Sequence, residues 1–139
     1  MPTVSFAGLR TGHQYTIHQL AKHWGYADYH ALARGVVTPR GQNVIILFMT
    51  EDKERWAKGA QYTGDSTFGS YVIYDGPEDH FAEERMIHHE TTGDQIHLFH
   101  RTRAGEPYTY MGELRFVDAE KHRARPTRFT FQLLRTILA

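Results

Sequence analysis

The sequence predicts a mixed α+β protein with a small barrel-like architecture. Five or six short segments are rich in β-branched and aromatic residues, which is typical of strands, and helical patterns occur only near the start and the middle of the chain. A length of 139 residues suits one hydrophobic core better than two separate cores. We therefore expect a single domain over residues 1–139.

The first expected element is an amphipathic helix that begins after Thr16 and stops at Gly25. Threonine is a good N-cap, apolar residues recur at helical spacing between these two positions, and glycine commonly ends a helix. A second, shorter helical piece is expected over Asp28–Arg34, because Asp28 is a capping residue and Gly35 follows it.

The segment Asn43–Thr50 predicts a strand buried on both faces. Its apolar and β-branched residues run without alternation, a pattern found in strands covered on both sides, so we expect this strand to be central in the sheet. The charged segment 51–61 is expected to be a loop or a frayed helical turn.

The second half of the chain alternates strand patterns with turn residues. A strand is expected over Tyr71–Tyr74, closed by the turn Asp75-Gly76-Pro77, and a weaker helical pattern covers Glu78–His89. Three further strands are expected at 96–100, 108–117 and 128–133.

The charges sum to zero but are unevenly distributed along the chain. Residues 51–100 hold eleven acidic against four basic residues, whereas residues 1–50 hold four basic against one acidic and residues 101–139 hold eight against four. If the two basic ends met in space, a neutral protein could present a basic face to phosphate. Ordinary solvated faces are the alternative interpretation.

Composition excludes several classes of function. The chain has no cysteine, so disulfides, thiolate zinc sites and a cysteine nucleophile are excluded. The first residues lack a signal-peptide pattern, and no apolar run is long enough to cross a bilayer. We therefore expect a soluble, cytoplasmic protein without a membrane partner.

A set of short motifs follows a fixed order along the chain. In that order they resemble the PUA/SRA-like superfamily, in particular the modified-base-binding domains attached to HNH endonucleases and helicases in bacterial modification-dependent restriction systems. The resemblance covers roughly residues 13–118. The matching residues are Gly35-Val36 with Pro39, Leu47-Phe48, Tyr62 with Asp65, Tyr74-Asp75-Gly76, Ile96-His97-Leu98-Phe99, and Tyr108-x-Tyr110-x-Gly112.

This resemblance implies a twisted, partly closed β-barrel with flanking short helices. It also implies a sequence-tolerant reader of double-stranded DNA that flips a modified cytosine, 5-methylcytosine first among the candidates, into a concave pocket. No cofactor or metal is expected. The sequence lacks a neighbouring HNH or helicase module, so cleavage is not implied, and any partner nuclease is unknown.

Tyr62 and Asp65 are the first candidates for the base pocket. An aromatic ring can stack on a base while a carboxylate accepts a hydrogen bond from the cytosine amino group, although Gly64 beside them also suits a plain turn. Strand alternation places Tyr71 and Tyr74 on opposite faces, so at most one of them can line a pocket. The other candidates, each with a core, lid or turn role as the alternative, are Thr38, Trp56, Phe68, Tyr71 and Tyr74.

Arginines are the candidates for contacts with the DNA backbone or for a finger into the space that a flipped base leaves. We expect only a minority of them to act in this way, because most surface arginines are simply solvated. The candidates are Arg34, Arg40, Arg101, Arg103, Arg123, Arg125 and Arg128.

Two other classes of function stay open. One is an RNA-binding or small-ligand-binding PUA-like module. The other is a metal-dependent nuclease, for which the acidic runs and a histidine-rich stretch supply possible ligands, but no His-Glu-x-x-His pattern occurs. The histidines in question are His80, His88, His89, His97 and His100.

Overall fold

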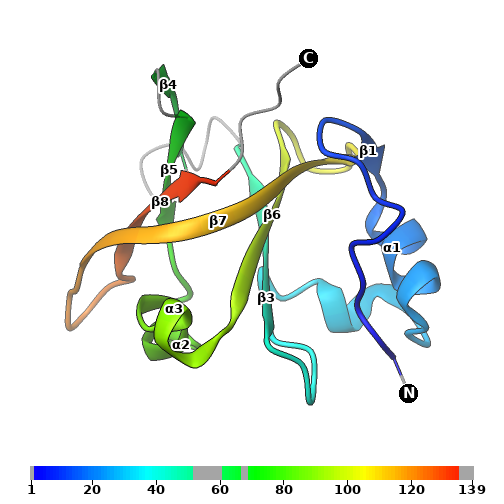
Figure 1. Ribbon diagram of the computed structural model, residues 1–139, viewed down its shortest axis with the longest axis horizontal. Coiled ribbons are helices and arrows are strands. Elements are labelled where there is room, and N and C mark those ends of the chain that lie inside the picture. The colour runs from blue at the N-terminus through cyan, green and yellow to red at the C-terminus, as the bar shows by residue number, and fades with distance from the viewer. Residues whose placement is uncertain (1, 52–60, 67–68, 135–139) are drawn as a thin grey trace.

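The computed structural model describes residues 2–51, 61–66 and 69–134, and at 61–66, 69 and 70 it describes the backbone alone. The helices are α1 (Ile17–Trp24), the 3-10 helix η1 (Tyr29–Leu32), α2 (Glu83–Ile87) and α3 (His89–Thr92). The strands are β1 (Gln14–Tyr15), β2 (Val36–Val37), β3 (Val44–Thr50), β4 (Gln61–Ser66), β5 (Gly69–Asp75), β6 (Gln95–Arg101), β7 (Tyr108–Glu120) and β8 (Arg128–Leu133). The predicted mixed α+β class is confirmed (Figure 1).

All the described strands belong to one twisted sheet. Its hydrogen-bonded order is β2-β3-β6-β7-β8-β5-β4, and β1 pairs with the start of β7. Among the described strands, β3 and β6 are the one parallel pair. Among the described residues no ladder joins β2 to β4, so the sheet is open between these ends and closure into a barrel stays a prediction.

The long strand β7 connects the two halves of the sheet. Its first part pairs with β1 and β6, and its second part pairs with β8. Register shifts occur between Leu98 and Phe99 in the β6–β7 ladder and between Phe116 and Asp118 in the β7–β8 ladder. Bulges of this kind bend a strand, and Figure 1 shows β7 crossing the molecule from β1 to the β7–β8 loop.

Two hydrophobic cores lie on opposite faces of β3 and β6. The first, which we call the α2 core, is covered by Phe81, Met86 and Ile87 and contains Val36, Ile45, Leu47, Met49, Val72, Tyr74, Met86, Ile96, Leu98, Leu114, Phe129, Phe131 and Leu133. The second, the α1 core, contains Val4, Leu20, Ala21, Trp24, Leu32, Val37, Ile46, Phe48, Phe99, Tyr108 and Tyr110. The strands of the β5–β8 side contribute residues to the α2 core alone.

This arrangement corrects the expected place of β3. The strand is buried on both faces as predicted, but it is second from the edge of the sheet rather than central. Its burial comes from the two cores that cover its two faces, not from having long strands on both sides. Its outer neighbour β2 has only two residues.

The helices follow the capping signals in the sequence to different degrees. The first prediction is confirmed: Thr16 and Gln19 form a capping box, and Gly25 ends α1 in the left-handed conformation. The piece after Asp28 is a single turn of 3-10 helix. The helix expected over 78–89 is wrong in extent, because a turn occupies residues 78–82 and two short helices follow it. No helix in the described part of the chain is long and apolar enough to span a membrane.

Candidate functional site

The first candidates for the base pocket lie on the edge strand β4. Tyr62 is paired with Val72 and Asp65 with Ser70, and the register shifts between Thr63 and Asp65. A bulge at an edge strand is a common way to redirect a side chain. The side chains of Tyr62 and Asp65 lie outside the described residues, as do Trp56 and Phe68 altogether.

The two tyrosines of β5 lie on opposite faces of the sheet, as alternation predicts. Tyr74 is buried in the α2 core, and burial together with the charge of Asp75 raises the pKa of its phenol. Tyr71 is 36% exposed on the other face. Tyr71 is therefore the one of the pair that a ligand can reach, while Tyr74 is a packing residue. Thr38, which follows β2, is half-buried.

The face on which Tyr71 lies is not covered by either core. It carries the polar pairs that cross from β5 to β8 and from β8 to β7. Arg128 makes two hydrogen bonds to Asp75, at 2.8 and 3.1 Å, and Arg115 donates to Gln132 at 2.8 Å. Tyr71 is the backbone partner of Gln132. Among the described residues, the result is a sheet face on which the partly exposed ring of Tyr71 lies among polar side chains.

The seven candidate arginines divide into engaged and unengaged residues. The guanidinium of Arg34 lies over the Phe81 ring at 4.9 Å, that of Arg101 lies over Tyr108 at 4.4 Å and bonds to Thr50 and Glu106, and that of Arg128 bonds to Asp75. Four exposed arginines have no side-chain hydrogen bond or ion pair within the described ranges: Arg40, Arg103, Arg123 and Arg125.

These four arginines do not form one group. Arg103 lies in the loop before β7, and Arg123 and Arg125 lie in the loop after it, so the two loops are at opposite ends of the longest strand (Figure 1). These arginines therefore do not form a basic face made by the two ends of the chain. The strongest local concentration of positive charge is the β7–β8 loop with its flanks, where Lys121, Arg123, Arg125 and Arg128 fall within eight residues.

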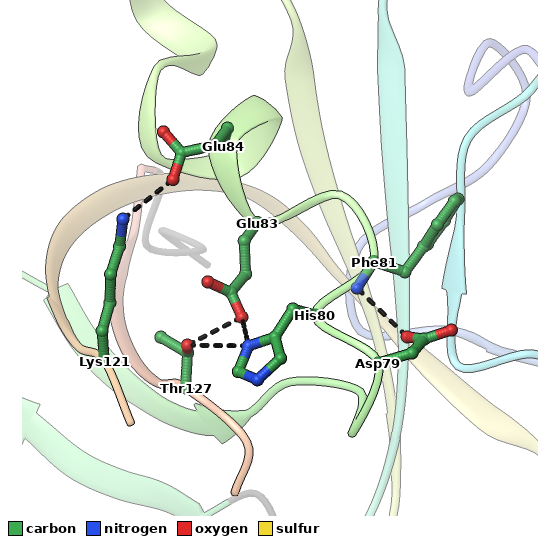
Figure 2. Close-up of polar contacts among 7 residues, drawn as sticks. All are labelled: Asp79, His80, Phe81, Glu83, Glu84, Lys121 and Thr127. Carbon is green, nitrogen blue, oxygen red and sulfur yellow. Dashed lines mark hydrogen bonds and ion pairs between the residues drawn. The ribbon is translucent and has the colours of Figure 1, made fainter. Parts of the chain in front are cut away.

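A second polar cluster lies where the β7–β8 loop meets the start of α2. Glu83 is buried although its side chain is ionisable, with 10% of that side chain exposed, and its Oε2 accepts a hydrogen bond from Thr127 Oγ1 at 2.7 Å. The same oxygen contacts Nδ1 of His80, whose side chain is 33% exposed. Figure 2 shows the three side chains converging, while Asp79 and Phe81 point away from them.

The loop that carries His80 is fixed by several local contacts. His80 N donates to Pro77 O at 3.0 Å, and Phe81 N donates to Asp79 Oδ1 at 3.1 Å. Both His80 (φ 60°) and Ala82 (φ 64°) have positive φ, which is unusual for residues other than glycine. Non-glycine residues in this conformation cost energy and cluster at functional sites.

The histidines that a metal site would need lie apart. Among the described residues no group of three or more histidine, aspartate or glutamate side chains is arranged to hold a metal ion. His88 pairs with Glu84 on the surface, and His100 pairs with Glu51. His89 is buried, where Nε2 accepts from Phe116 N and Nδ1 bonds to Asp94 O. His97 is buried in another part of the sheet.

Comparison with known proteins adds no identification. A scan against protein-family models and a search of curated proteins gave no match.

The His80–Glu83–Thr127 cluster was not predicted as a unit. Its one local signal is the spacing of three residues between His80 and Glu83, which brings side chains together at the start of a helix.

Proposed function

We propose that this protein is a reader of modified cytosine in duplex DNA, with 5-methylcytosine as the first candidate, and that it binds the modified base outside the helix. The proposal includes the partly closed barrel and the pocket around Tyr62 and Asp65 that the family resemblance implies. It includes no catalytic step and no cofactor. Such a reader acts in the cytoplasm, where bacterial DNA lies.

The observation that carries the proposal is the face of β5 and β8 that neither hydrophobic core covers, on which Tyr71 is 36% exposed. Nucleic-acid-binding sheets commonly present an aromatic ring among polar groups, because every base has a flat face that stacks on a ring. Tyr71 belongs to the strand that pairs with β4, so the exposed ring and the backbone of the predicted pocket residues share one hairpin. Unengaged arginines lie on loops at both ends of β7.

The energies of the expected interactions are of the right size. Unstacking and unpairing a base costs a few kcal/mol, and stacking on an aromatic side chain returns about 1–3 kcal/mol. Contacts with phosphate must supply the rest. Each phosphate neutralised steepens the dependence of affinity on salt, so the phosphate contribution can be measured separately from modified-base recognition.

A titration decides the proposal. The protein is titrated into two labelled duplexes of the same sequence, one with a central 5-methylcytosine and one with cytosine, and the anisotropy is measured. We expect tighter binding of the methylated duplex. A 2-aminopurine next to the modified base is expected to brighten on binding, because extrusion of its neighbour unstacks it. Equal affinities for the two duplexes would remove the modified-base proposal.

Substitutions test which residues are responsible for the preference for the methylated duplex. Tyr62→Ala and Asp65→Asn are expected to abolish the preference for the methylated duplex, and Tyr71→Ala is expected to weaken binding of both duplexes. Tyr29→Ala is the matched control, since Tyr29 lies on η1, against the α1 core. If Asp65→Asn and Tyr62→Ala fold correctly and still discriminate, the pocket is elsewhere.

An open sheet face with an exposed aromatic residue also suits single-stranded RNA or DNA. The same titration includes a single strand and a structured RNA. Preference for either over both duplexes would favour the PUA-like RNA-binding alternative.

A further inference from the structure

The cluster of His80, Glu83 and Thr127 has the features of a prepared binding site rather than of a simple surface contact. A carboxylate that is almost fully buried is used to hold an imidazole that is one-third exposed. Thr127, which is completely buried, donates a hydrogen bond to the same carboxylate oxygen that contacts His80. Figure 2 shows that His80, Glu83 and Thr127 come from the turn before α2, from α2 and from the strand-side end of the β7–β8 loop.

The arrangement determines which nitrogen of His80 is available. Nδ1 lies against the Glu83 carboxylate, which only accepts hydrogen bonds, so this nitrogen carries a proton. Nε2 has no hydrogen-bond partner among the described residues. A carboxylate behind one nitrogen of an imidazole fixes the orientation of the ring and directs the other nitrogen away from the carboxylate.

The loop that ends at Thr127 also supplies positive charge. Arg125 is two residues and Arg123 four residues before Thr127, and both are exposed without a side-chain partner in the described part of the chain. Two residues of extended chain span about 7 Å, which is within the reach of an arginine side chain. Exposed guanidinium groups thus belong to residues two and four positions before the threonine that bonds to the Glu83 carboxylate.

Other charged groups surround the cluster, and most of them are paired. On α2 and the end of β7, Lys121 donates to Glu84 at 2.8 Å. On β5 and β8, Asp75 binds Arg128, and Arg34 lies over Phe81 from the η1–β2 segment. Asp79, in the same turn as His80, accepts from the backbone of Phe81. The remaining charged neighbours are Glu78, Glu120 and His122, of which the last two pair with each other.

We propose that His80, positioned by Glu83 and Thr127, binds a phosphodiester group of nucleic acid together with Arg123 and Arg125 of the β7–β8 loop. The proposal rests on the proposed function in that the phosphate belongs to the DNA that the protein reads. It adds to that function a specific phosphate contact at the C-terminal end of β7, whereas Arg103 lies before the strand begins. It also gives the contact a pH dependence, because only the doubly protonated imidazole donates from Nε2 while Nδ1 bonds to Glu83.

The first experiment uses the unmodified duplex, so it does not depend on recognition of a modified base. The slope of log affinity against log salt is measured at pH 6 and at pH 8.5. Each phosphate contact contributes about one unit to this slope. For the unchanged protein we expect a steeper slope and tighter binding at pH 6 than at pH 8.5.

Replacement of His80 separates a ligand contact from a structural role. His80→Gln is expected to lower affinity roughly three- to tenfold at pH 6 and to reduce the salt slope by about one there, with no change at pH 8.5. His88→Gln is the matched control, since His88 also pairs with a glutamate on α2 but is exposed. A loss that is the same at both pH values, or an equal loss in the control, would refute the contact.

The partners of His80 are tested in the same assay. Glu83→Gln keeps the shape of the side chain and removes the carboxylate that orients the His80 ring, so the gain in affinity at pH 6 over pH 8.5 is expected to shrink. Arg123→Ala with Arg125→Ala is expected to reduce the salt slope by up to about two units, and Arg10→Ala, at an exposed arginine outside the candidate set, serves as the arginine control. An unchanged slope in the double variant would exclude the β7–β8 loop from the site.

A small probe distinguishes failure of this site from failure of DNA reading. Dimethyl phosphate is a monoanion over the whole pH range, so its own charge does not change. With ¹⁵N-labelled histidine, the His80 resonances are expected to move with dimethyl phosphate at pH 6 and not with an equal ionic strength of chloride. If His80 responds to the probe but the protein binds no duplex, the proposed function fails and the phosphate site stands. If His80 does not respond, and His80→Gln folds and binds duplex normally, the site is refuted.

Discussion

His97 provides a sensitive test of how the α1 core is built. It is 5% exposed, and its ring stacks on that of Phe6 with 3.6 Å between centroids and 6° between planes. Nδ1 lies 2.7 Å from the hydroxyl of Tyr110, and Nε2 lies 3.0 Å from Gln95 Oε1. Since Gln95 Oε1 accepts from Nε2–H, the Tyr110 hydroxyl donates to Nδ1, and the ring is neutral.

Burial lowers the pKa of His97 from 6.5 to about 4. The unfolded chain therefore binds a proton at this residue at pH values where the folded protein does not, and protonation favours unfolding. The stability is fully present above the unfolded pKa and is lost as the pH falls from about 6.5 toward 4. Linkage gives a loss of about 1.4 kcal/mol at pH 5.5 and about 2.5 kcal/mol at pH 4.5.

The assay compares the unchanged protein with His97→Asn by urea unfolding at pH 7.5 and pH 5.5. Asparagine keeps an acceptor near the Tyr110 hydroxyl but does not titrate, and it costs stability at both pH values because the stacking on Phe6 is lost. We expect the gap between the two proteins to shrink by about 1.4 kcal/mol at pH 5.5. His23→Asn on the surface of α1 is the control. A gap that is equal at both pH values would refute a buried neutral imidazole.

Two further predictions concern stability. Thr16→Ala removes the capping box of α1 and is expected to cost about 1 kcal/mol in urea unfolding, whereas Thr16→Ser restores most of it. Asp94→Asn removes the charge that Arg85 binds through two hydrogen bonds of 2.9 Å, which lower the pKa of Asp94. We expect a loss of about 2 kcal/mol at pH 7. The loss becomes smaller as the pH falls from the unfolded pKa near 3.9 through the lowered pKa of the folded carboxyl, below which the carboxyl is protonated in both states.

Local signals in the sequence predicted the elements whose stability is local. Helix α1 follows its cap residues at both ends, because Thr16 and Gly25 satisfy the helix termini without help from the rest of the chain. The strands β5, β6, β7 and β8 occur at the predicted places, since β-branched and aromatic residues alternate there or are buried on both faces. The place of β3 in the sheet could not be predicted, because pairing partners distant in sequence determine it.

The helix expected after Pro77 shows a different limit of sequence reasoning. Phe81, Met86 and Ile87 do lie on one side and cover the α2 core, as the pattern indicated. However, the hydrogen bond from Phe81 N to Asp79 Oδ1 and the positive φ of Ala82 keep the first turn out of the helix. An amphipathic pattern reports which side chains are buried, and it does not report where the backbone conformation changes.

The same turn explains why the proposed phosphate site was missing from the sequence interpretation. A regular helix from residue 78 would place His80 and Glu83 one turn apart on its surface, where an ion pair contributes little. The turn instead buries the Glu83 carboxylate against Thr127, which is 44 residues away in the chain. Because Thr127 ends the loop that carries Arg123 and Arg125, one tertiary contact both orients the imidazole and fixes the base of the basic loop. The backbone of the predicted pocket and the proposed phosphate contact thus lie on segments joined through β5 and β8.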